Sequence, residues 1–72
     1  MKAIKEKLRG NRINECLFKR NMSRAELIDL TGLDASFVAK IVNNKKGNIN
    51  VTTAHKIAKA LQFPIEIVFI FN

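Results

Sequence analysis

Hydrophobic residues recur every three or four positions through most of the chain, which is the periodicity of amphipathic α-helices. The spacing of Ile13, Cys16 and Leu17 predicts a first helix over residues 12–21. A similar pattern predicts another helix over residues 51–61. Its expected inward stripe consists of Val51, Ala54, Ile57, Ala58 and Leu61.

Two shorter helices are predicted in the middle of the chain. Ser23 is followed three residues later by a glutamate, which is a capping-box pattern for a helix over residues 24–31. Gly32 suits the left-handed backbone of a tight turn. Asp34 then suits the N-cap of a third helix, giving a helical segment at 34–43. Two capped helices joined by a glycine-containing turn indicate a helix-turn-helix.

The two ends of the chain leave alternatives open. Residues 1–10 are expected to form either a short helix or a basic arm ahead of a domain over 11–72. The apolar C-terminal tail at 63–72 favours a strand because it is β-branched and aromatic, whereas Pro64 at a helix start would favour a short final helix. We expect part of this tail to pack inward and part of 69–71 to stay available to another chain.

The charge of the chain favours a polyanionic partner. It has 13 Lys and Arg against 6 Asp and Glu, a formal net charge of +7, and no acid between Asp34 and Glu66. Such a balance points first to nucleic acid.

Other classes of protein are disfavoured by length and composition. With 72 residues the chain is one small domain, and its single cysteine, Cys16, provides neither an internal disulfide nor a cysteine-type zinc site. We expect Cys16 to be a packed core residue in a protein of the reducing cytoplasm. The longest apolar run, 67–71, is too short to span a bilayer, so no membrane partner is expected. No paired carboxylates, nucleophile–base set or metal cluster is evident, so neither an enzyme nor a cofactor is expected.

The central stretch resembles the Cro/repressor type of helix-turn-helix protein. The resemblance covers about residues 11–63 and rests on "MSRAELIDLTGLDASFVAKIVNNKK" followed by "INVTTAHKIAKALQF". It implies an all-α bundle of four to five helices, similar to the lambda-repressor-like DNA-binding domains. Among these proteins the chain looks most similar to small regulators of lysis and lysogeny in temperate phages, and in particular to modulator-of-repression proteins. The resemblance implies duplex operator DNA as one partner and a phage repressor protein as another.

In a helix-turn-helix the second helix lies in the major groove while the first crosses the phosphates. The candidate DNA-binding residues are therefore Arg24, Ser36, Lys40, Lys45 and Lys46. Only Ser36 and Lys40 on the groove helix can hydrogen-bond a base, so we expect weak base readout, with the lysine pair holding phosphates.

A protein interface is the second candidate. The groove helix displays mostly small residues around Phe37, which is either a core-edge residue or an exposed anchor. The interface is expected to consist of Arg24, Ala35, Ser36, Phe37, Ala39 and Lys40, with Phe69 and Phe71 of the tail. We therefore expect a regulator that binds a partner repressor as an antirepressor or co-repressor, with weak DNA contact and with self-association as at most a weak homodimer. The alternative is a Cro-like repressor that binds a specific operator as a homodimer.

Overall fold

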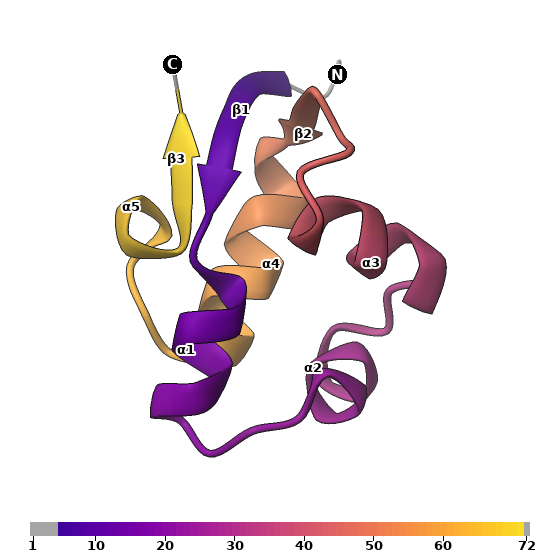
Figure 1. Cartoon of the computed structure of the whole chain (residues 1–72), viewed down its shortest axis with the longest axis vertical. Coiled ribbons are helices and arrows are strands. Elements are labelled where there is room, and N and C mark those ends of the chain that lie inside the picture. The colour runs from indigo at the N-terminus through magenta and orange to yellow at the C-terminus, as the bar shows by residue number, and fades with distance from the viewer. Residues whose placement is uncertain (1–4, 72) are drawn as a thin grey trace.

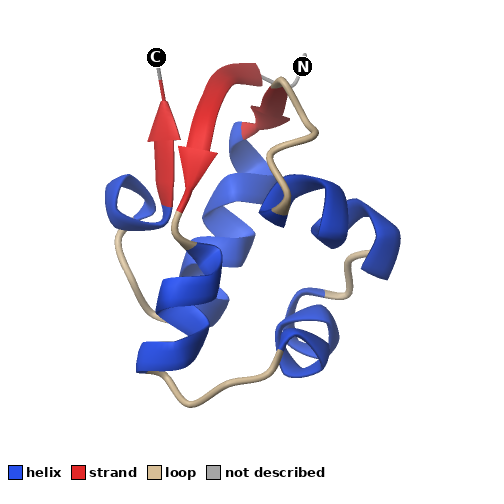
Figure 2. Ribbon diagram, in the orientation of Figure 1, coloured by secondary structure: helices blue, strands red, loops and turns tan. Residues whose placement is uncertain are grey.

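The computed structural model describes residues 5–71, and the side chains from residue 9 onward. In this range five helices form the body of the molecule, and three short strands stand at one end (Figures 1 and 2). In chain order the elements are β1 (Lys5–Asn11), α1 (Ile13–Lys19), α2 (Arg24–Thr31), α3 (Ala35–Val42), β2 (Asn48–Asn50), α4 (Val51–Leu61), α5 (Ile65–Val68) and β3 (Phe69–Phe71).

The small helical bundle expected from the sequence is confirmed. Helix α4 covers the predicted range, and the Asn50 side chain caps it by accepting a hydrogen bond from the Thr52 N–H at 2.8 Å. Helix α1 is shorter than expected because Arg20 takes the C-cap position and Asn21 has a positive φ of 52°. Such a φ is incompatible with continuing the helix.

The three-stranded sheet was not expected. Its strand order is β2-β1-β3, and both pairings are antiparallel. The short helix proposed for residues 1–10 is therefore wrong for residues 5–10, which belong to β1, and the part of the proposal on residues 1–4 lies outside the described residues. The reason is that β1 pairs with segments about 40 and 60 residues further along the chain, and no local pattern contains that information.

The C-terminal tail forms both of the structures that the sequence left open. Residues 65–68 make the single turn of α5, and residues 69–71 continue as β3 beside β1. Val68 and Phe69 are both buried, and Phe69 is only 1% exposed. The expectation that Phe69 is available to a partner is therefore wrong, because pairing of β3 with β1 turns its ring into the core. Phe71 remains half-buried.

The core lies between the helices and one face of the sheet. Cys16 belongs to it, and burial raises the pKa of its thiol, so the thiol stays protonated at neutral pH. No helix in residues 5–71 is long and apolar enough to cross a membrane. The buried apolar side chains are Ile13, Cys16, Leu17, Leu27, Val38, Ile41, Val42, Ile49, Ala54, Ile57, Ala58, Leu61, Val68 and Phe69.

Candidate nucleic-acid interface

Helices α2 and α3 form the helix-turn-helix that the sequence predicted. The Ser23 hydroxyl accepts from the Glu26 N–H at 3.1 Å, and the Glu26 carboxylate accepts from the Ser23 N–H at 3.1 Å, which completes the capping box. Gly32 ends α2 with a φ of 70°, in the left-handed region. The Thr31 hydroxyl donates to the Leu27 carbonyl at 2.8 Å inside the bend. These local bonds fix the direction in which α3 leaves α2.

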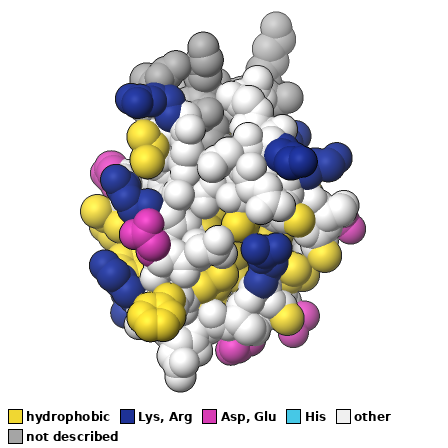
Figure 3. Space-filling model, in the orientation of Figure 1, with side chains coloured by type: hydrophobic (Ala, Val, Ile, Leu, Met, Phe, Trp, Pro, Cys, Tyr) yellow, Lys and Arg dark blue, Asp and Glu magenta, His cyan; other side chains and the backbone are white. Residues whose placement is uncertain are grey.

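Helix α3 has one buried side and one exposed side. Val38, Ile41 and Val42 lie in the core, and this anchors the helix from its middle to its C-terminal end. On the opposite side Ser36 and Lys40 are exposed, one helical turn apart. In Figure 3, Lys and Arg side chains lie near α3 and the loop that follows it, and others lie along the opposite edge of the molecule. The exposed side of α3 is therefore polar and cationic.

The hydroxyl of Ser36 is engaged within the protein. It donates a hydrogen bond to the Asp34 carboxylate, and this bond lowers the pKa of Asp34 below its usual range. Asp34 was expected to cap α3 through its side chain, but its carboxylate makes this bond instead and shows no side-chain cap bond. Ser36 consequently offers a base only its acceptor lone pairs.

Phe37 lies at the edge of the core, where it supports a lysine. Its side chain is half-buried, and the Lys46 Nζ lies 5.1 Å from its ring centroid. Both residues line a small hollow with Asn48, Ile49 and Asn50. A cation over an aromatic face is attracted by the ring quadrupole. This contact restrains Lys46 beside α3, whereas Lys45 is exposed.

The turn after α3 is rigidly tied to the rest of the fold. Asn44 has a left-handed φ of 59°, and the Lys45 N–H donates to the Lys40 carbonyl at 2.8 Å. The Asn11 side-chain amide donates to the Ile41 carbonyl at 2.8 Å and to the Asn44 side-chain oxygen at 3.1 Å. The junction of β1 and α1 thus holds the C-terminal end of α3 in place.

One exposed residue of this face was missed in the sequence. Asn43 caps the C-terminus of α3 and is exposed. It follows Ser36 by seven positions and Lys40 by three, which is the spacing of one helical face. The three-to-four periodicity of exposed polar residues was the signal that could have identified it. Asparagine can make a bidentate contact to adenine in the major groove.

The remaining candidates are distributed as follows. Arg24 is the first residue of α2 and is exposed, as is Ala35 at the start of α3, while Ala39 is half-buried. Of the predicted protein interface, the α3 residues share one region of the surface, but Phe69 is buried on β3 and does not join them. Within the described residues no group of three His, Cys, Asp or Glu side chains could hold a metal ion.

Comparison with known proteins agrees with this geometry. Residues 12–72 match the family of Cro/C1-type HTH DNA-binding domains, and this range includes α1 to α5 and β3. The chain belongs to this Cro/C1-type helix-turn-helix family. It is also similar to YotL of Bacillus subtilis (strain 168), an SPbeta prophage-derived uncharacterized HTH-type transcriptional regulator, with 31% identity over 62 residues that cover 86% of this chain and 78% of YotL. No solved structure matches the chain. As a Cro/C1-type domain, the chain uses α2 and α3 as its helix-turn-helix.

Proposed function

We propose that this Cro/C1-type protein is a transcriptional regulator that binds operator DNA by placing α3 in the major groove. The observation that carries the proposal is the division of α3 into a fully buried apolar side and an exposed side with Ser36, Lys40 and Asn43. An α-helix fits the major groove, and side chains of these types can hydrogen-bond base edges.

The proposed contacts divide into two groups. Lys40 and Asn43 read bases, and Ser36 contributes an acceptor. Lys45, Lys46 and Arg24 contact phosphates, because the two lysines lie in the turn that follows α3 and Arg24 lies at the start of α2, the helix that crosses the phosphates in a helix-turn-helix. Contacts to phosphates position the protein, and contacts to bases select the site.

The similarity to YotL supports a role in the control of prophage genes. We propose that the protein acts on DNA in the cytoplasm of a bacterial host. We propose that the lysis–lysogeny switch is the process regulated. The direction of regulation follows from where the operator lies relative to a promoter.

Binding to a partner repressor is the second candidate function. The small residues Ala35 and Ala39 on α3 favour it, since they let another backbone approach closely. Two of the three aromatic residues in its predicted interface give it less support, because Lys46 lies over Phe37 and Phe69 is buried. We therefore rank operator binding ahead of an antirepressor or modulator-of-repression mechanism.

Fluorescence anisotropy with labelled duplexes tests the proposal. The best-bound duplex is first selected from a random pool, and its affinity is measured over a salt series. Lys40→Gln together with Asn43→Ala should reduce the preference for that duplex over a scrambled one, each base contact carrying about 1–3 kcal/mol of discrimination.

Lys19→Gln on α1 is the matched control, because it also removes an exposed lysine charge but lies outside the α3 face. It should leave the preference for the selected duplex unchanged. Failure of the pool to yield any preferred duplex, combined with a stable complex between this chain and the repressor of the same prophage, would establish the second candidate instead.

A further inference from the structure

Two side chains at the start of α3 together accept hydrogen bonds but donate none. Asp34 directly precedes α3, Ser36 is the second residue of the helix, and both are exposed. The Ser36 hydroxyl donates its single proton to the Asp34 Oδ2. An ionised carboxylate has no proton to donate, so the two side chains offer an approaching group only oxygen lone pairs. We call Asp34 and Ser36 the acceptor pair.

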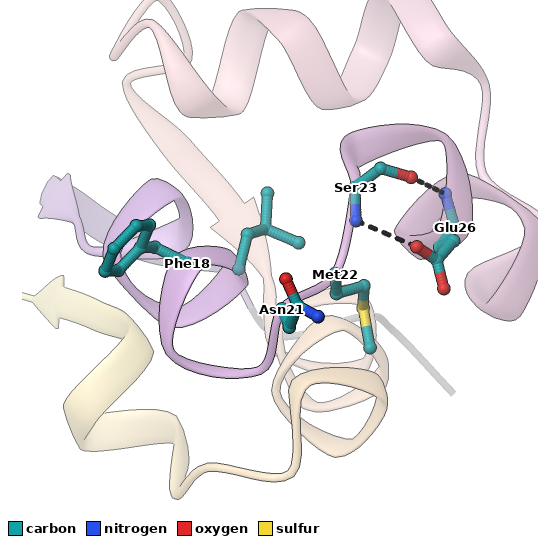
Figure 4. Close-up of a pocket in the computed structure, with 6 residues that line it drawn as sticks. Phe18, Asn21, Met22, Ser23 and Glu26 are labelled. Atoms are coloured by element: carbon teal, nitrogen blue, oxygen red, sulfur yellow. Dashed lines mark hydrogen bonds between the residues drawn. The ribbon is translucent and has the colours of Figure 1, made fainter.

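Asp34 differs from the carboxylate at the start of the preceding helix. In Figure 4 the Glu26 carboxylate turns back to the Ser23 N–H, which commits it to the capping box of α2. The Asp34 side chain shows no such cap bond at the start of α3. The hydrogen bond from Ser36 lowers the pKa of Asp34, so its carboxylate is ionised at neutral pH. A charged, exposed carboxylate therefore lies at the end of α3 that leads into the major groove.

This carboxylate opposes DNA binding in general. The next acid along the chain is Glu66, and the exposed lysines of α3 and its following turn all lie between the two. Both strands of a duplex carry phosphate charges, which repel a carboxylate. Asp34 therefore costs affinity on any duplex that gives it no hydrogen-bond donor. The donors in the major groove are the exocyclic amino groups of cytosine and adenine.

We infer that Asp34 is a specificity-determining residue, which selects a cytosine in the operator by accepting a hydrogen bond from its 4-amino group. The inference rests on the proposed function, because it requires α3 to lie in the major groove. Guanine and thymine present only acceptors there, so the acceptor pair repels them. Adenine presents its amino group beside the N7 acceptor, whereas cytosine presents a donor and no acceptor of its own.

Ser36 acts through Asp34 and is a positioning residue. Its hydroxyl holds one carboxylate oxygen before DNA arrives, and the other oxygen remains directed by the same bond. A side chain that is already held in place loses less conformational entropy when it binds. The preference for cytosine should therefore depend on the Ser36 hydroxyl as well as on the Asp34 charge.

The two ends of α3 have opposite hydrogen-bonding character. Lys40 lies one helical turn after Ser36 and can only donate, and guanine O6 and N7 are the acceptors that suit a lysine. One turn advances the helix by about 6 Å, which is about two base pairs at a rise of about 3.4 Å each. The operator should therefore contain a cytosine and, about two base pairs away, a guanine.

Base-by-base replacement in the selected duplex tests the inference. At one C·G pair the parent protein should lose about tenfold in affinity when cytosine is replaced by thymine or guanine. Asp34→Asn keeps an acceptor for the Ser36 hydroxyl but removes the charge and adds a donor, so it should lose most of this preference. Asp29→Asn is the matched control, because it removes an exposed carboxylate from α2. It should leave the preference unchanged.

A cytosine analogue without the amino group isolates the contact. Placing 2-pyrimidinone deoxynucleotide at that position removes the donor and keeps the ring. The parent protein should lose about tenfold in affinity for this duplex, and Asp34→Asn should lose much less. Ser36→Ala should reduce the preference for cytosine, and Ser36→Thr, which restores a hydroxyl, should recover it. Circular dichroism verifies that each variant is folded at the temperature of the titrations.

Three results would overturn the inference. They are a selected duplex in which no position prefers cytosine, an Asp34→Asn variant that keeps the full preference, and an Asp29→Asn variant that loses it equally. Failure of the proposed function gives a different result, since no duplex is then preferred over a scrambled one, and the inference fails with it. A preferred duplex that responds to Lys40→Gln with Asn43→Ala but not to Asp34→Asn rejects the inference alone.

Discussion

The guanidinium of Arg20 lies 4.3 Å from the ring centroid of Phe63 and joins the end of α1 to the end of α4. Its Nε donates to the Leu61 carbonyl at 3.0 Å, and an Nη donates to the Gln62 carbonyl at 2.6 Å. The last carbonyls of a helix have no partner within the helix. Arg20 satisfies two backbone acceptors at the end of α4 while stacking on the residue that follows.

Arg20→Ala should lower the free energy of unfolding by about 1–3 kcal/mol, because the substitution removes both the hydrogen bonds from a charged donor and the cation–π interaction. Arg20→Lys should recover only part of this, since an ammonium cannot match the two-pronged geometry. Urea denaturation measures both variants, with Lys19→Ala as a neighbouring control. A lysine variant as stable as the parent would contradict this account.

Phe69 should behave as a core residue. Its side chain belongs to β3 and is 1% exposed. Phe69→Ala should therefore lower the free energy of unfolding by about 3–5 kcal/mol, through reduced burial and the cavity left behind. Phe18→Ala, at an 88% exposed position, should change the stability of the monomer by no more than about 0.5 kcal/mol. Thermal unfolding at low protein concentration compares them. Equal destabilisation by the two variants would contradict the burial pattern.

The parts of this fold that local interactions determine were predictable from the sequence. The Ser23 capping box, the left-handed turn at Gly32 and the Asn50 cap each depend on residues close together in the chain. The strand β1 depends on partners far along the chain, and the burial of Phe69 follows from that pairing. Non-local pairing was therefore the source of the corrections on β1 and Phe69.

The candidate site follows the same rule. The exposed positions of Ser36 and Lys40 were predictable from helical periodicity alone. The contact of Lys46 with Phe37, and the attachment of Asn11 to α3, join residues that no sequence pattern links. Asn43 was missed because it lies where the helix meets a polar turn, and the run of turn-forming residues hid its position on the helical face.

The Asp34–Ser36 hydrogen bond should make stability depend on acidic pH. This bond lowers the pKa of Asp34 in the folded protein below its ordinary value of 3.8. Because the pKa of Asp34 is lower in the folded protein, its ionised carboxylate stabilises the fold fully above pH 3.8. This stabilisation is lost as the pH falls through the folded-state pKa.

Ser36→Ala removes the main cause of the shift in the pKa of Asp34. Its melting temperature should therefore fall less steeply than that of the parent as the pH decreases below 3.8. Thermal unfolding followed by circular dichroism at a series of acidic pH values measures the difference. Parallel curves for parent and variant would show that the hydrogen bond does not shift the titration of Asp34.

The lysine pair after α3 should contribute affinity without sequence preference. Replacing Lys45 and Lys46 with Gln should weaken binding to all duplexes about equally, and should reduce the salt slope of log affinity by about 1.8, or 0.9 for each phosphate that is no longer neutralised. Anisotropy titrations on the selected and scrambled duplexes provide the comparison. A loss of affinity confined to one duplex would mean that a lysine reads bases.

Asn11 should couple the stability of the sheet junction to DNA binding. Its side-chain oxygen accepts from the Ile13 N–H at 3.1 Å, and its amide donates to the Ile41 carbonyl at 2.8 Å. Asn11→Asp keeps an oxygen that accepts from the Ile13 N–H. It replaces the amide that donates to the Ile41 carbonyl with a second oxygen, which cannot donate and is repelled by that carbonyl. The variant should lose about 1–3 kcal/mol of stability and release the C-terminal end of α3.

Binding of the selected duplex by Asn11→Asp should therefore weaken more than binding of a scrambled duplex, because base contacts need α3 in place and phosphate contacts tolerate its movement. Asn14→Asp is the matched control, since Asn14 is exposed on α1 and the change adds the same negative charge. Both proteins are compared at a temperature where circular dichroism shows them folded. If Asn11→Asp retains the selectivity of Asn14→Asp under those conditions, then Asn11 stabilises the fold without positioning α3 for base recognition.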